Sequence, residues 1–162
     1  MDLPNSSKQT ACAIEYRAAR PDEFFVLAGL RGEMAREMGD DFDGRSADWR
    51  AKFAAYFGGK QAAGDARIFF AYDGTAPIGC AIVSIPDEYR RSVFNIRNAY
   101  VNAVYVQPAY RRRGIAKNLM QLAVGWARER GCSRVRLRAS NDGRHLYEQI
   151  GFRTGREMEL DL

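Results

Sequence analysis

The stretch from residue 101 to residue 126 constrains the fold most, because it joins a short apolar run to a basic turn and an amphipathic helical pattern. Residues 101–106 (VNAVYV) are few and rich in β-branched types, which favours a strand over a helix, and Pro108 follows them. The turn at residues 111–114 reads RRRG. After it, apolar residues recur on one face of a 3.6-residue period, namely Ile115, Leu119, Leu122, Ala123 and Trp126.

A strand that leads through a glycine-containing turn into a helix forms a binding site for anions. The first N–H groups of a helix have no intrahelical partner and carry the positive end of its dipole. Gly114 has no Cβ, so a phosphate can approach the backbone closely. Residues 101–162 carry 12 basic and 6 acidic side chains, while the rest of the chain is nearly balanced. The stretch therefore predicts a phosphate-bearing ligand, although charge alone does not separate a cofactor from a nucleic acid.

The remaining pattern predicts an α/β chain with the order β-α-α-β-β-β-α-β-α-β. Strands are expected at 13–18, 67–72, 77–85, 92–106, 134–139 and 152–160, and helices at 22–38, 46–57, 113–130 and 142–150. The three consecutive strands between residues 67 and 106 are predicted to form an antiparallel meander. Residues 39–44 read as an acidic loop, Ser46 as the N-cap of the second helix and Gly58-Gly59 as its end.

Length and composition favour one cytoplasmic domain. We expect residues 1–10 to be a flexible lead and residues 11–162 to form a single domain. No apolar run approaches 18 residues and the N-terminus lacks an apolar signal core, which argues against a membrane span or a signal peptide. Three widely spaced cysteines and a single histidine argue against a structural zinc site and favour reduced thiols.

Two motifs resemble those of the GNAT superfamily of N-acetyltransferases. The turn is similar to the acyl-CoA signature [QR]-x-x-G-x-[GA], read here as Arg111, Gly114 and Ala116. Residues 146–152 (LYEQIGF) resemble the LYEKLGF signature near the C-terminus of that family. The resemblance covers about residues 13–160. It implies the GNAT fold, an α/β (α+β) arrangement with a central mixed, mostly antiparallel twisted sheet of six to seven strands flanked by about four helices.

The resemblance also implies acetyl-CoA as cofactor. Backbone amides at about residues 112–117 would hold the pyrophosphate, and the free backbone of the preceding strand would pair with the pantetheine arm and support the thioester oxygen. The implied cofactor-binding residues are Val104, Tyr105, Val106, Arg111, Arg112, Arg113, Gly114, Ile115, Ala116, Lys117, Ser140 and Asn141. The family often has asparagine seven residues before its tyrosine. That position is Ser140 here, which also suits a helix N-cap, and Asn141 follows it.

By the same resemblance the activity is transfer of an acetyl group to a primary amine by direct attack in a ternary complex. Tyr147 would then protonate the departing thiolate, since a phenol with a pKa of about 10 keeps its proton at neutral pH. A tyrosine packed between helix and sheet is the alternative interpretation. Some relatives have a glutamate base where this chain has Tyr100. Candidates to bind the acceptor are Glu33, Glu37, Asp41, Tyr100 and Asn102, and a solvated acidic loop is the alternative.

Two other classes of protein are alternatives to the N-acetyltransferase hypothesis. A catalytically silent acyl-CoA-binding or sensor domain would share the fold, because fold does not fix function. A nucleic-acid binder would use the same arginines, but residues 134–138 contain none of the aromatic side chains that stack on bases. We therefore expect a small-molecule or peptide amine as acceptor, no nucleic acid, no membrane, no metal, and a possible homodimer.

Overall fold

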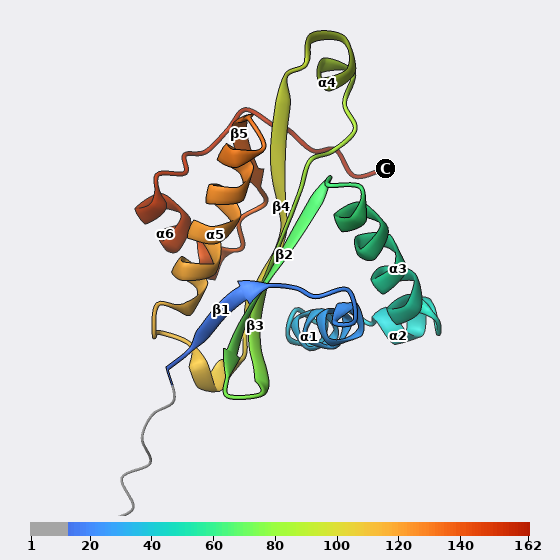
Figure 1. The fold of residues 1–162 in the computed structure, drawn as a ribbon, viewed down its shortest axis with the longest axis vertical. Coiled ribbons are helices and arrows are strands. Elements are labelled where there is room, and N and C mark those ends of the chain that lie inside the picture. Colours follow the sequence, from blue (N-terminus) through green and yellow to red (C-terminus); the bar gives the residue numbers. More distant parts are fainter. Residues whose placement is uncertain (1–12) are drawn as a thin grey trace, which may run out of the picture.

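Helices cover both faces of one twisted sheet in the computed structural model, which describes residues 13–162 (Figure 1). The flexible lead predicted for residues 1–10 lies outside the described residues. The elements run β1 (Glu15–Ala18), α1 (Phe24–Glu37), α2 (Phe42–Arg45), α3 (Trp49–Ala62), β2 (Ala66–Asp73), β3 (Ala76–Ser84), α4 (Tyr89–Phe94), β4 (Arg97–Val106), the 3₁₀ turn η1 (Pro108–Tyr110), α5 (Ile115–Glu129), β5 (Cys132–Leu137) and α6 (Asn141–Ile150).

The sheet has five strands in the order β1-β2-β3-β4-β5. The first three pairs are antiparallel, so the predicted meander is confirmed. Strand β5 pairs parallel to β4, and α5 makes the connection between them. This is the mixed, mostly antiparallel sheet that the resemblance implied.

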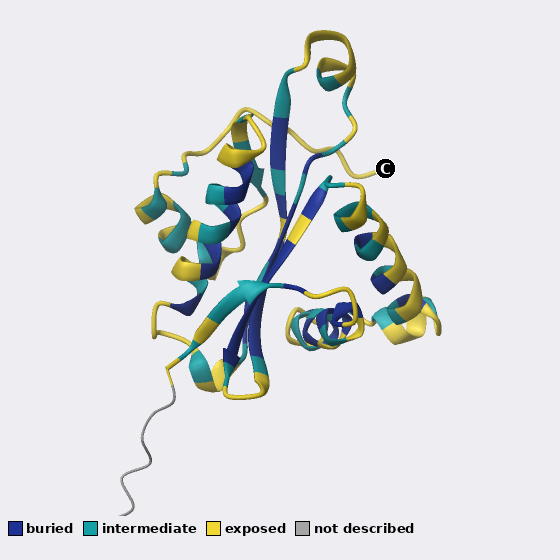
Figure 2. Cartoon of the chain, viewed as in Figure 1, coloured by how far each residue is buried: buried dark blue, intermediate teal, exposed yellow. Residues whose placement is uncertain are grey.

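Two apolar cores lie on opposite faces of the sheet (Figure 2). Because side chains alternate along a strand, each central strand contributes to both cores. Strand β2, for example, directs Phe69 and Ala71 to one face and Ile68 and Phe70 to the other. The first face is covered by α5, whose predicted apolar stripe is buried at Ile115, Leu119, Ala123 and Trp126. The second face is covered by α1 and α3.

The predicted strand over residues 152–160 is wrong, and it explains why the sheet has five strands rather than six or seven. The described chain has no regular element after α6. Met158 and Leu160 are 95% and 84% exposed, so no apolar layer covers this segment. Two ion pairs join it to β5 and the residue that follows β5, namely Arg136–Glu157 and Arg138–Glu159, and exposed ion pairs contribute little to stability.

Three further predictions of elements need correction. The strand predicted to start at residue 92 begins at Arg97, because residues 89–94 form α4 and Asn95 ends that helix with a φ of 53°. The acidic loop contains the short helix α2, capped by Asp41. Helix α3 begins at Trp49 and continues through Gly58-Gly59. A Cβ added to Gly58 would lie 3.5 Å from the Phe24 ring on α1, an ordinary van der Waals contact, and the helix continues beyond Gly59 to Ala62, so Gly58-Gly59 does not end it.

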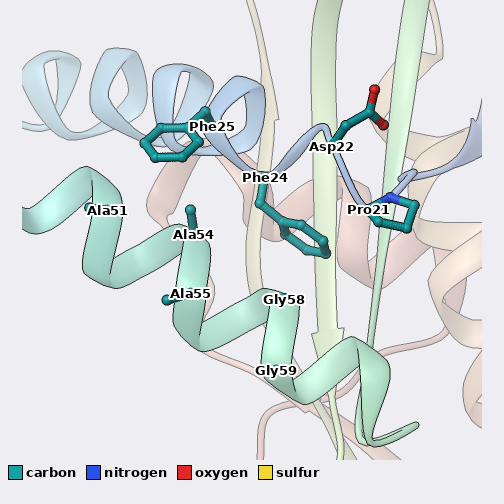
Figure 3. Close-up of a pocket in the computed structure, with 9 residues that line it drawn as sticks. All are labelled: Pro21, Asp22, Phe24, Phe25, Ala51, Ala54, Ala55, Gly58 and Gly59. Carbon is teal, nitrogen blue, oxygen red and sulfur yellow. The ribbon is translucent and has the colours of Figure 1, made fainter.

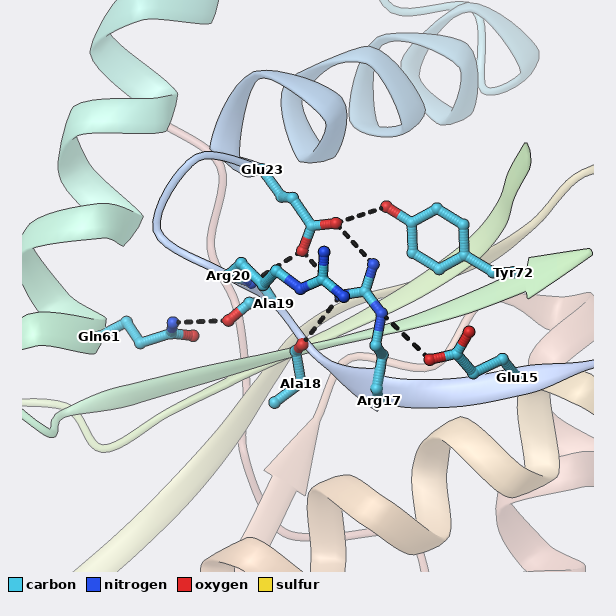
Figure 4. Close-up of polar contacts among 8 residues, drawn as sticks. All are labelled: Glu15, Arg17, Ala18, Ala19, Arg20, Glu23, Gln61 and Tyr72. Carbon is cyan, nitrogen blue, oxygen red and sulfur yellow. Dashed lines mark hydrogen bonds and ion pairs between the residues drawn. The ribbon is translucent and has the colours of Figure 1, made fainter. Parts of the chain in front are cut away.

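A nearly buried carboxylate joins β1, the start of α1 and β2 (Figure 4). Glu23 Oε1 accepts hydrogen bonds from Arg17 Nη2 at 2.7 Å and from Tyr72 Oη at 2.9 Å. Its Oε2 accepts from Arg17 Nη1 at 2.8 Å and from the Arg20 backbone N–H at 2.7 Å. The bonds from Arg17, with those from the Arg20 N–H and Tyr72, lower the pKa of Glu23 to about 2 against the opposing effect of burial.

We predict that Glu23→Gln lowers the free energy of unfolding by about 2 to 4 kcal/mol at pH 7, because Arg17 then loses its charge partner in a mostly buried place. The folded pKa lies below the ordinary value of 4.5, so this contribution is present above pH 4.5 and disappears as the pH falls toward 2. Urea denaturation of both proteins at pH 7, 4.5 and 3 measures it. Glu15→Gln is the control, since Glu15 pairs with the same arginine but is 59% exposed. An equal effect of the two variants would contradict the prediction.

Candidate active site

The sheet opens where β4 and β5 part. Their ladder runs from Arg97 opposite Cys132 to Val101 opposite Leu137 and stops there, while β4 continues to Val106. On its other edge β4 keeps pairing with β3 up to Val106. The backbone from residue 102 to residue 106 is thus paired on one side only, and Val104, Tyr105 and Val106 lie in this stretch. An extended ligand with amide groups can add to such an edge as a strand would.

A β-bulge marks the point at which the strands part. Val83 pairs with Val101 and Ile82 pairs with Ala103, so Asn102 is an extra residue in β4. A bulge bends its strand and increases the local twist, which moves the rest of β4 away from β5. The Asn102 side chain points to neither core. It is exposed, and its Oδ1 accepts a hydrogen bond from Ser84 Oγ at 2.7 Å.

The turn after β4 has the backbone of an anion site. Arg112 and Gly114 both adopt positive φ, at 64° and 77°. Gly114 is the N-cap of α5 and supplies no capping side chain, and the first recorded bond of the helix runs from the Asn118 N–H to the Gly114 carbonyl. The N–H groups of residues 115–117 therefore have no intrahelical acceptor. A Cβ built on Gly114 has no atom within 4 Å, so open space lies against this backbone.

The three arginines of the turn have different surroundings. Arg112 and Arg113 are exposed, and within residues 13–162 neither has a carboxylate partner. The Arg113 guanidinium lies 5.3 Å from the Tyr110 ring, and Tyr110 Oη donates to Asp73 at 3.0 Å, which ties the turn to the β2–β3 hairpin. Arg111 is directed elsewhere: its guanidinium contacts the Val106 carbonyl and a carboxylate on α1.

Helix α6 carries Tyr147. Ser140 is its N-cap, with Oγ accepting from the Gly143 N–H at 3.2 Å, so the capping interpretation of Ser140 is confirmed, and exposed Asn141 is the first helical residue. The half-buried Tyr147 ring lies edge-on to Phe152 and directly over Gly143. Burial raises the pKa of this phenol above its ordinary value of 10.0. A group with that pKa keeps its proton at neutral pH and can donate it.

Acidic side chains of α1 meet the end of β4. Tyr105 Oη donates to Glu37 Oε1 at 2.5 Å, and Gln107 Nε2 donates to Glu33 Oε2 at 3.0 Å. Gln107 was not among the predicted site residues. Its position two residues after Tyr105, on the same side of an extended chain, is the signal that identifies it. Arg111 pairs with Glu37, and the bonds from Arg111 and Tyr105 lower the pKa of that carboxyl.

The other predicted acceptor residues are not brought to this cluster. Asp41 accepts from the Gly44 N–H at 2.8 Å as the cap of α2. The neighbouring acids of the loop pair with arginines, Asp40 with Arg45 and Asp43 with Arg50. Half-buried Tyr100 lies opposite Ser84 and Arg136 in the paired part of β4, before the bulge.

A hollow of the described surface lies at another place. It lies between α1 and α3, and on the α3 side it is lined by Ala51, Ala54, Ala55, Gly58 and Gly59 (Figure 3). Phe24 and Phe25 stand at its wall. It contains one charged residue, Asp22, and it is distant in the fold from the open edge of β4, so we assign no ligand to it. Within residues 13–162 there is also no group of three side chains that could hold a metal ion, and no helix has the length and apolar composition needed to cross a membrane.

Comparison with known proteins decides the family. Residues 30–152 match the family described as the Acetyltransferase (GNAT) family. The chain belongs to the GNAT acetyltransferases. The open edge of β4 and the turn before α5 fit acetyl-CoA, the cofactor that the sequence motifs imply. They combine unpaired strand backbone, free helical N–H groups and two arginines that have no carboxylate partner within residues 13–162.

Individual relatives are similar over part of the chain. A glucosamine 6-phosphate N-acetyltransferase from Trypanosoma brucei brucei is 33% identical over 86 residues, which cover 52% of this chain and 57% of that protein. An aminoglycoside N(6')-acetyltransferase from Acinetobacter genomosp. 13 is 35% identical over 72 residues, covering 43% and 49%. The chain thus spans about half the length of these relatives. A protein from Clostridium acetobutylicum described as a predicted acetyltransferase, crystallised with acetyl-CoA, is 25% identical with a TM-score of 0.77, covering 92% of this chain and 96% of that one.

We predict that Gly114→Ala weakens acetyl-CoA binding by about tenfold or more, because its Cβ would enter the space through which a phosphate approaches the backbone. Isothermal titration calorimetry measures the dissociation constant. Gly74→Ala is a matched control: Gly74 also has positive φ, at 59°, and open space around its Cβ, but it lies in the β2–β3 hairpin. Both variants carry a similar backbone strain of about 1 kcal/mol. Equal dissociation constants for the two variants would contradict a cofactor contact at Gly114.

Proposed function

We propose that the protein is an N-acetyltransferase that transfers the acetyl group of acetyl-CoA to a primary amine of a small molecule by direct attack in a ternary complex. The observation that carries this proposal is the one-sided backbone of residues 102–106, which leads directly into the anion-binding turn before α5. This arrangement suits a ligand with an extended amide arm and a pyrophosphate. Residues 11–162 form the domain that performs the reaction.

The residues have distinct tasks in this proposal. The backbone of Val104, Tyr105 and Val106 holds the extended arm, and one of their N–H groups donates to the carbonyl oxygen that gains charge as the amine attacks. The N–H groups of residues 115–117 and the side chains of Arg112 and Arg113 hold the pyrophosphate, with Lys117 nearby on α5. Acetyl-CoA supplies the activated acyl group. Tyr147 donates its proton to the sulfur as the carbon–sulfur bond breaks, and the nitrogen–carbon bond forms in its place.

Glu33 is our candidate for the carboxylate that receives the acceptor. Within residues 13–162 it has no arginine or lysine partner, whereas the other predicted acids of this region are paired with arginines or, in Asp41, used as a cap. Its recorded contacts are to Gln107 and Tyr105, both neutral. A half-buried carboxylate with only neutral partners attracts an ammonium group and can accept its proton through water. The relatives that acetylate glucosamine 6-phosphate and aminoglycosides support an amine on a small polar molecule as the acceptor.

A catalytically silent acyl-CoA-binding domain is the alternative function. The effect of changing Tyr147 on turnover distinguishes this domain from an active N-acetyltransferase. A cytoplasmic location, a homodimer and the lack of nucleic-acid and membrane partners stay predictions.

A screen of amines with thiol release as readout tests the proposal first. Turnover of at least one amine supports it, and tight acetyl-CoA binding without turnover of any amine favours the silent domain.

We predict that Tyr147→Phe lowers kcat by about 100-fold while the dissociation constant of acetyl-CoA stays within about twofold, because general-acid donation contributes on that scale and the ring itself remains. The pKa of Tyr147 is raised, so the phenol should remain protonated and kcat should hold on the alkaline side to at least about pH 10. Thiol-release kinetics across pH measure both. Tyr56→Phe, on the exposed side of α3, is the control. An unchanged kcat in Tyr147→Phe would exclude the acid role.

We predict that Glu33→Gln raises the KM for a cationic acceptor by about tenfold and leaves acetyl-CoA binding unchanged, because a hydrogen bond to a charged group is lost at the acceptor only. Steady-state kinetics with the best amine of the screen measure the KM. Asp43→Asn is the matched control, since this acid lies in the same region but is paired with Arg50. A KM that responds equally to both changes would indicate a general charge effect and not a contact by Glu33.

A further inference from the structure

Arg111 occupies the first position of the acyl-CoA signature, yet its guanidinium is held by the protein itself. Its Nε donates to the Val106 carbonyl at 2.9 Å, and its Nη2 contacts Glu37 Oε2 at 2.5 Å. The same guanidinium lies 5.8 Å from the Tyr105 ring. One side chain therefore joins the last residue of β4, the last residue of α1 and the start of the anion-binding turn.

Arg111 differs from Arg112 and Arg113 in that a carboxylate neutralises its charge. Glu37 neutralises Arg111, so the pair adds little positive potential for a phosphate. Arg112 and Arg113 have no such partner among the described residues and keep their full charge. Glu37 is in turn fixed by Tyr105 Oη, which donates to its other oxygen. The carboxylate is thus oriented toward Arg111 by a tyrosine in β4.

We propose that Arg111 is a positioning residue, which sets the cofactor-binding turn against the end of α1 through Glu37 and does not itself bind the pyrophosphate. Acetyl-CoA affinity should then depend on Glu37, a residue on α1 that lies 74 positions away from Arg111 and outside the signature. This inference rests on the use of acetyl-CoA by the chain and not on the identity of the acceptor amine.

A double-mutant cycle on the full chain tests it, with acetyl-CoA affinity measured by calorimetry for the wild type, Arg111→Gln, Glu37→Gln and the double variant. We expect each single change to weaken binding by about three- to fivefold, the scale of a partly exposed ion pair, and the double change to be no worse than either. The KM for acetyl-CoA should rise by the same factor with kcat unchanged. Lys52→Gln breaks the exposed pair with Asp48 on α3 and should have no effect.

Two results would overturn the proposal. If Arg111→Gln weakens binding while Glu37→Gln leaves it unchanged or tightens it, Arg111 meets the pyrophosphate directly. If neither single change alters the affinity, the link between the turn and α1 has no role in binding. Melting temperatures without ligand show whether a variant is folded. If Arg111→Gln does not fold, Arg111→Lys replaces it. A lysine keeps the positive charge but cannot reach both partners as the guanidinium does. Weakened acetyl-CoA binding in Arg111→Lys would then support the positioning role, and retained binding would indicate a direct charge contact with the pyrophosphate.

Discussion

The bulge at Asn102 is the constraint on which the rest of the site depends. A strand with both edges paired has no backbone group left for a ligand, and a strand with one edge open presents a row of donors and acceptors. The bulge gives β4 two parts: one that is paired on both edges and one that has an open edge. Up to Val101 it holds β5 in the sheet, and beyond that residue its free edge faces outward. From Tyr100 to Val106 β4 stays paired with β3, and its residues Val101, Ala103, Tyr105 and Val106 belong to the two apolar cores.

Electrostatics then divides this opening into two parts. On the α5 side, positive charge is left uncompensated at Arg112, Arg113 and the free helical N–H groups. On the α1 side, most acids are paired with arginines from their own neighbourhood, and Glu33 remains without one in the described chain. An anionic cofactor and a cationic acceptor are the ligands that such a division suits. Arg111 stands between the two parts, and its pairing with Glu37 belongs to neither ligand.

Sequence patterns identified most of the elements, because their signals are local. The apolar stripe of α5 and the cap at Ser140 depend on residues within a few positions of one another. The errors arose where the signal was not local. The segment after Gly151 alternates like a strand, but a strand exists only if another backbone pairs with it, and none does within the described residues. Gly58-Gly59 resembles a helix end, but α3 continues past it to Ala62 while it packs against α1.

The sequence alone determined the chemistry that is available: a basic glycine turn at a helix start, a tyrosine on the last helix, and a cluster of acids early in the chain. These follow from residue type and short spacing, which local backbone preferences convert into structure. The tertiary structure decided which of these groups are free to act. It placed an extra residue in β4 where β5 departs, gave most of the acids arginine partners, and turned Arg111 away from its neighbours toward α1. Pairing of strands and of charges joins residues far apart in the chain, and no local pattern specifies such partners.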